Sequence, residues 1–173
     1  TRGTFIVHTL PGLERIAWQE IVERFPRATL VTTSQLPQRN GLTLFRYGGP
    51  PRHLLDLSTA EDLFFLLRGI PRVSWGHEGL SQIYQSLLDV PTLGRALSVY
   101  SLAQGRRVRG KIPFRVIARM RSGDQPFRRI DLQQSVEKAI ERNGGSRWKA
   151  VRKQGELEIW ATLNGLDFTC ALR

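Results

Sequence analysis

Two clusters of cations with few nearby acids lie in the second half of the sequence. The first cluster contains one acid, Asp124, and consists of Arg106, Arg107, Arg109, Lys111, Arg115, Arg119, Arg121, Arg128 and Arg129. The second cluster surrounds Trp148 and consists of Arg147, Lys149, Arg152 and Lys153. Guanidinium groups bind phosphate oxygens through paired hydrogen bonds, and an exposed tryptophan can stack on an unpaired base. The clusters therefore indicate a phosphate-bearing partner, with Trp148 either as a stacking residue or as a cover for the edge of the core.

The net charge of +11 is concentrated in the same part of the chain. Residues 102–173 carry 16 of the 26 basic residues but 7 of the 15 acidic ones. A localised cationic surface indicates a nucleic acid, an anionic lipid or an acidic protein as partner. No basic amphipathic helix with aromatic anchors appears, so we expect no membrane partner. A general preference for arginine, with solvated charges, is the alternative explanation.

Other chemistry has little support in the residues. The three histidines are far apart and lack the spacing of metal ligands, so we expect no metal site. Cys170 falls on the apolar face of an expected strand, where a buried and unreactive thiol is typical. No glycine-rich loop joins a strand to a helix, which excludes a dinucleotide fingerprint or a P-loop. We predict no catalytic residue and no cofactor within this chain.

The pattern of apolar residues predicts the elements that position these cations. Over the first 74 residues the expected order is β-α-β-β-α-β, with strands at 4–9, 28–33, 42–47 and 62–70. A turn is expected at 36–41, and "GGPP" can open a short second helix that ends at Leu57. This order is the ferredoxin-like arrangement.

Residues 75–173 predict a second unit of order α-α-β-α-β-β, giving an α+β fold with domains at 1–74 and 75–173. Two helices are expected at 80–90 and 92–103, a strand at 113–121 and a helix capped by Asp131 and ended by Gly144. A short strand at 147–151 and a hairpin with an Asn164-Gly165 turn complete the unit. We expect Trp75 to pack between the two domains.

The strand at 113–121 alternates apolar and basic residues. Phe114, Val116, Ala118 and Met120 form its core face, whereas the arginines lie on the other face. Arg115 is favoured as a partner of Glu156 or Glu158 on a neighbouring strand.

Several segments resemble the THUMP-containing RNA methyltransferases. "TLPGLERIAWQEI" is similar to the opening of that family, and "LLDLSTAEDLFFLLRGI" to its next landmark. "FRVIARMRSGDQPFRRIDLQQSVEKAI" resembles the strand, basic loop and helix of the THUMP domain, and "ELEIWATLNGLDFTCAL" its closing hairpin. The segments occur in the family order over nearly the whole chain.

The resemblance implies an N-terminal ferredoxin-like domain joined to a THUMP domain that binds structured RNA, especially the acceptor stem and 3′ end of tRNA. It implies a cytoplasmic protein with a methyltransferase domain after Arg173 that uses S-adenosylmethionine to methylate guanine N2. From the family it assigns RNA binding to the basic loop, with Arg119, Arg121, Arg128 and Arg129. The alternatives are a 4-thiouridine or pseudouridine synthase, a ribosomal RNA target, or a module that binds an acidic partner without being part of an enzyme.

Overall fold

The computed structural model describes residues 3–35, 40–89, 92–121 and 123–173. Helices and strands are mixed along the chain, so the predicted α+β class is confirmed. The chain divides into two compact units, Thr1–Leu66 with Ser98–Arg107 and Leu67–Leu97 with Val108–Arg173. The first stretch of the first unit ends at Leu66, within a strand. The domain boundary expected after residue 74 remains a proposal.

The first unit has the predicted ferredoxin-like order of strands. Its elements are β1 (Gly3–Thr9), α1 (Glu14–Arg24), β2 (Thr29–Gln35), β3 (Gly41–Tyr47), the 3₁₀ helix η1 (Pro51–Asp56) and the first part of β4 (Asp62–Ile70), up to Leu66. The strands lie in the order β2-β3-β1-β4, and β1 pairs antiparallel with both β3 and β4. The expected second helix is the 3₁₀ helix η1, which begins at a proline. The turn expected at 36–41 lies mostly outside the described residues.

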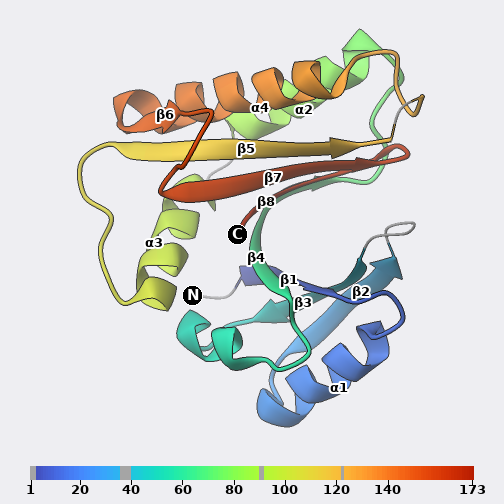
Figure 1. The fold of residues 1–173 in the computed structure, drawn as a ribbon, viewed down its shortest axis with the longest axis vertical. Coiled ribbons are helices and arrows are strands. Elements are labelled where there is room, and N and C mark those ends of the chain that lie inside the picture. Colours follow the sequence, from blue (N-terminus) through green and yellow to red (C-terminus); the bar gives the residue numbers. More distant parts are fainter. Residues whose placement is uncertain (1–2, 36–39, 90–91, 122) are drawn as a thin grey trace. The chain divides into compact units, whose positions relative to one another are not determined.

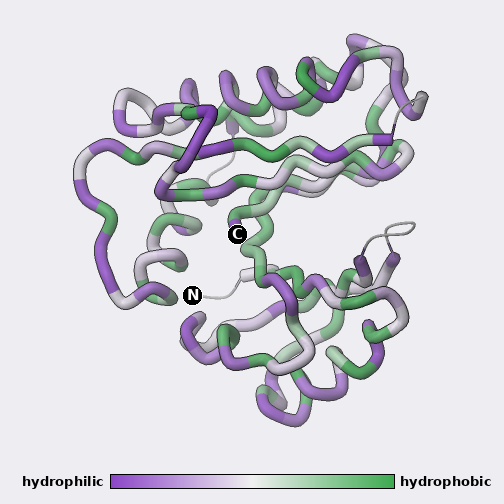
Figure 2. Tube along the Cα trace, in the orientation of Figure 1, coloured by the Kyte–Doolittle hydropathy of each residue, from purple (hydrophilic) through white to green (hydrophobic). Residues whose placement is uncertain are grey.

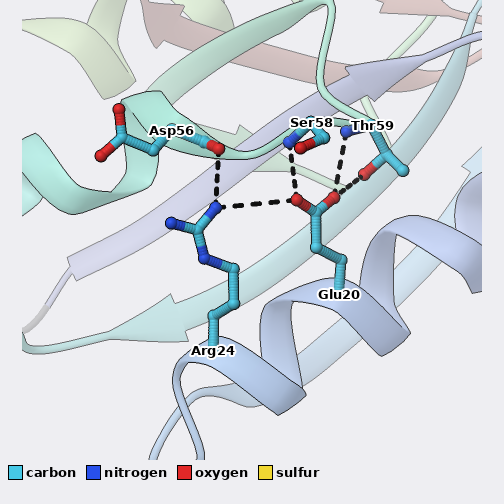
Figure 3. A network of polar contacts seen from close by, with 5 residues as sticks. All are labelled: Glu20, Arg24, Asp56, Ser58 and Thr59. Atoms are coloured by element: carbon cyan, nitrogen blue, oxygen red, sulfur yellow. Dashed lines mark hydrogen bonds and ion pairs between the residues drawn. The ribbon is translucent and has the colours of Figure 1, made fainter.

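A polar network fixes α1 against the segment between η1 and β4 (Figure 3). Both carboxylate oxygens of Glu20 accept backbone N–H groups, from Ser58 at 2.6 Å and from Thr59 at 3.0 Å. The Thr59 hydroxyl donates a further bond at 2.6 Å. Burial raises the pKa of Glu20, but these hydrogen bonds together outweigh it and hold the pKa below its usual value. The network is therefore structural.

The second unit carries most of the basic residues. Its elements are α2 (His77–Leu88), α3 (Thr92–Gln104), β5 (Ile112–Met120), α4 (Arg129–Gly144), the 3₁₀ helix η2 (Gly145–Arg147), β6 (Trp148–Ala150), β7 (Leu157–Asn164) and β8 (Asp167–Leu172). The end of α3 groups with the first unit. Strands lie in the order β8-β7-β5-β6, and β5 is parallel to both β6 and β7. Helix α4 packs on β5 and against α2, so the two helices cover one face of these strands (Figure 1).

The alternation predicted for β5 is present. Phe114, Val116 and Ala118 are buried, whereas Arg115 is exposed, because successive residues of a strand point to opposite faces. Arg115 lies opposite Glu158 of β7 in the register, and its charge helps to lower the pKa of that carboxyl. The ion pair of Glu158 is nevertheless made with another residue, Arg173, at 2.9 Å.

Two local predictions were wrong by a few residues. Asp131 is the third residue of α4 and not its cap: the backbone N–H of Arg128 donates to Asp131 Oδ2 at 2.8 Å. In the β7–β8 hairpin, Asn164 pairs with Asp167. The turn therefore consists of Gly165, with φ +62°, and the residue after it. Glycine fits this position because a left-handed conformation strains other residues.

Candidate nucleic-acid interface

Cations from two distant segments meet where β5 and β6 begin. The side chain of Arg147 donates from Nε to the carbonyl oxygen of Gly110 at 3.0 Å, across 37 residues of sequence. Ile112 pairs with Trp148 at the start of the parallel strands, so the residues before each strand lie together. We call the resulting group the strand-start cluster; it consists of Arg109, Lys111, Arg147 and Lys149. Arg106 and Arg107 follow α3 and group with the first unit instead.

A second group, the helix-start cluster, lies where β5 ends and α4 begins; it consists of Arg119, Arg121, Arg128 and Arg129. Strand β5 has nine residues. At a rise of about 3.3 Å per residue, the two clusters are about 26 Å apart along it. The sheet therefore carries cations at both ends of β5 and does not gather them at one point. Figure 2 shows the hydrophilic loop that leads into β5 and the hydrophilic segment around β6.

Two members of the helix-start cluster have partners within the protein. The guanidinium of Arg128 donates to both carboxylate oxygens of Asp131 at 3.2 Å, although its side chain is 78% exposed. Hydrogen bonds from Arg128 hold the pKa of Asp131 below its usual value. The guanidinium carbon of Arg119 lies 4.8 Å from the ring centroid of Trp160, which is cation–π geometry. Although few acids lie near these cations in the sequence, Arg119 and Arg128 therefore have partners in the fold.

Trp148 belongs to the core and does not present its ring to a ligand. Its side chain is 7% exposed and makes an edge contact with Phe114 at 5.9 Å between centroids. A Cβ atom added to Gly144 would collide with the indole, which shows how tightly the end of α4 packs on it. Of the two roles considered for Trp148, the structure therefore supports the cover of the core edge.

A hollow of about 290 Å³ lies between α4 and the edge of β5. Its lining consists of residues 115–118 of β5, then Arg129, Ile130, Gln133, Gln134 and Glu137 of α4, and Arg152. The short strand β6 ends beside Phe114, and the N–H of Val151 reaches the carbonyl oxygen of that residue. Since Phe114 directs its backbone groups towards β6, alternation places the N–H groups of Val116 and Ala118 at the open edge within the hollow.

The chemistry of this hollow suits an oxyanion. Three arginines and one acid, Glu137, line it, and Glu137 accepts a hydrogen bond from the Gln133 amide at 3.0 Å. Neither Arg129 nor Arg152 makes an ion pair with any residue that the structure describes. Guanidinium groups, amides and strand-edge N–H groups are all hydrogen-bond donors, and phosphate oxygens accept from such donors.

Eight of the predicted binding cations are exposed, and their side chains have no hydrogen-bond or ion-pair partner among the described residues: Arg107, Arg109, Lys111, Arg121, Arg129, Lys149, Arg152 and Lys153. Unsatisfied side chains of this kind are available to an external anion. Groups of histidine, cysteine and acidic residues suitable for a metal ion are absent from the described part of the chain. Burial raises the pKa of the Cys170 thiol to about 12, which makes it unreactive.

Within the described ranges, none of the helices is long and apolar enough to cross a bilayer. The hollow was not foreseen from the sequence, and the side chain of Trp75, which was expected to pack between the two domains, is exposed instead. Both depend on contacts between segments that are distant in sequence, so no local pattern indicates them.

The sequence matches no family model and no curated protein, whereas several solved structures share its fold. TrmN from Thermus thermophilus superposes with a TM-score of 0.70 at 19% identity, over 99% of this chain and 45% of that one. A protein described as a possible methylase from Clostridium difficile 630 gives a TM-score of 0.65 at 13% identity, over 99% and 41%. A 4-thiouridine synthetase, solved with RNA and ATP, gives 0.58 at 10% identity, over 100% and 41%. This chain thus spans less than half the length of these three proteins and has the fold that they share over that part.

Proposed function

We propose that this chain is the RNA-binding part of an RNA-modifying enzyme, an S-adenosylmethionine-dependent methyltransferase with a THUMP domain. Structured RNA, with the acceptor stem and 3′ end of tRNA as the first candidate, is its partner. The observation that carries the proposal is the set of exposed cations without partners, arranged along β5 and at both of its ends. A protein described as a possible methylase and an RNA-bound 4-thiouridine synthetase, both of the same fold, support it.

The physical character of the cations favours RNA over other anions. Most are arginines, which bind phosphate through paired hydrogen bonds and stack on bases. The clusters lie on loops and strand ends and not on an amphipathic helix, which a membrane-surface protein would use. A spacing of about 26 Å between the clusters suits a polymer with many phosphates.

The direct test is binding of labelled tRNA to this chain by fluorescence anisotropy, with heparin and anionic vesicles as competitors. Saturable binding that unlabelled tRNA displaces far better than equal charge of heparin or lipid supports the proposal. Equal displacement by all three would leave only a general affinity for polyanions and would contradict it.

The proposal places the cofactor in a catalytic domain outside this chain. Calorimetry of this chain with S-adenosylmethionine should therefore give no binding heat. Saturable binding would move the active site into residues 1–173. A thiouridine synthase is the second candidate because one such enzyme shares the fold. Full-length protein incubated with tRNA and either S-adenosylmethionine or a sulfur donor distinguishes the two, since methylation and thiolation add different masses to the nucleoside.

A further inference from the structure

Trp75 is exposed on a backbone that is held firmly on both sides. Its side chain is 62% exposed. On one side, the N–H of Ser74 donates to the Gln82 side chain at 2.9 Å. On the other, the N–H of Gly76 donates to Gln125 Oε1 at 2.8 Å, while Gln125 Nε2 donates to the carbonyl oxygen of Ser74 at 3.2 Å. The exposed indole is thus displayed by a fixed segment and not by a loose one.

The same contacts join the segment of Trp75 to the loop that carries part of the helix-start cluster. Gln125, which is 4% exposed, belongs to the loop between β5 and α4 that carries Arg121 and Arg128. A Cβ atom on Gly76 would lie 3.8 Å from Pro126, and the charge of His77 contributes to the lowered pKa of Asp131 in α4. Figure 1 shows the starts of α2 and α4 close together. The exposed aromatic ring therefore belongs to a segment that is bound to the loop between β5 and α4, and this loop carries exposed arginines.

We propose that Trp75 stacks on an unpaired base of the bound RNA while Arg121 and Arg129 bind phosphates beside it. This inference rests on the proposed function and adds the single-stranded character of the segment recognised there. The three other tryptophans suit the role less well: Trp18 is half-buried on α1 of the first unit, Trp148 is buried, and Trp160 has arginines over its ring at 4.8 and 5.7 Å. Rigid aromatic rings next to cations are the usual elements of single-strand binding.

The neighbouring charges distinguish this surface from a docking site for an apolar protein segment. An apolar partner would gain from the indole but would have to desolvate the arginines of the helix-start cluster without pairing them, which is costly. A nucleotide provides both groups that the surface requires, a π face for the ring and a phosphate for the arginines.

The test compares two RNA hairpins with the same stem, one with a single-stranded 3′ overhang and one with a blunt end. Trp75→Ala should weaken binding of the overhang hairpin by about 5- to 150-fold, the range expected for one stacked base. Binding of the blunt hairpin and the salt dependence of both should stay as in the wild type. Trp75→Phe should retain most of the affinity, and Leu55→Ala, which truncates another exposed apolar side chain, should have no effect.

Tryptophan fluorescence gives a second readout. Overhang RNA should quench part of the emission of the wild type, and this part should disappear in Trp75→Phe. Circular dichroism and thermal melting show whether the Trp75→Ala variant folds. If wild type binds both hairpins and Trp75→Ala binds the overhang as tightly, the stacking role is wrong although the proposed function stands. An equal loss for both hairpins would also overturn it, and absence of RNA binding by the wild type would overturn both proposals.

Discussion

Removing a single cation from the hollow should weaken RNA binding more than removing the same charge elsewhere on α4. Arg129→Gln and Arg152→Gln each delete one guanidinium that lines the hollow and has no partner among the described residues. A hydrogen bond to a charged group contributes about 1.5–3 kcal/mol, so each substitution should cost roughly tenfold or more in affinity. Each should also flatten the plot of log K against log salt by about 0.7–0.9.

The matched control is Arg142→Gln, which removes the same charge from an exposed residue of the last turn of α4. This position is 13 residues after Arg129, about 20 Å along the helix at 1.5 Å per residue, so affinity should change by less than about twofold. Glu137→Gln tests whether the electrostatic potential in the hollow favours an anion. It deletes the one acid that lines the hollow. RNA affinity should rise a few-fold, because a charge–charge interaction near the surface is worth about 1 kcal/mol.

The assay is fluorescence anisotropy of labelled tRNA at several salt concentrations, with thermal melting of each variant to establish that it is folded. The reasoning would be refuted if Arg142→Gln weakened binding as much as the two hollow variants. A loss of affinity in Glu137→Gln would contradict the assignment of the hollow to an anion.

Two further predictions concern the fold. The pKa of Glu20 is lowered in the fold, so its carboxylate contributes stability that is present at neutral pH and lost as the pH falls below the ordinary glutamate value of about 4.3. Glu20→Gln should therefore lower the free energy of unfolding in urea by about 1–3 kcal/mol at pH 7 and by less at pH 3. An equal loss at both pH values would contradict this account. Because Trp148 is buried, Trp148→Ala should lower the free energy of unfolding by about 3–5 kcal/mol, whereas a stable variant with weakened RNA binding would restore the rejected stacking role.

Strand boundaries and burial patterns were predictable because they depend on the alternation of apolar and polar residues along the sequence. The alternation from Phe114 to Met120 identified β5 and its core face, and the apolar run at 62–70 coincides with β4. The class of fold and the sheet order of the first unit follow from the sequence of such elements. Errors occurred at ends, where a shift of one residue changes a hairpin turn but leaves the strands in place.

The binding residues were less predictable because their surroundings are tertiary. Arg128 and Asp131 are three residues apart at the start of a helix, so their pairing was indicated by spacing and was overlooked. Sequence spacing does not show which of Trp148 and Trp75 is buried and which is exposed. Burial of the first depends on Phe114, and display of the second depends on Gln125, which lies 49 residues from Gly76 in sequence.

The central claim is that specific cations of the second unit bind RNA phosphates, and the salt dependence of RNA affinity tests it most directly. Arg121→Ala should flatten the slope by about 0.7–0.9, because one phosphate contact and its released counterions are lost. Arg15→Ala on α1 should leave the slope unchanged, since acidic residues of the same helix offset that charge. If Arg15→Ala flattened the slope as much as Arg121→Ala, binding would be a diffuse effect of net charge, and the site described along β5 would be wrong.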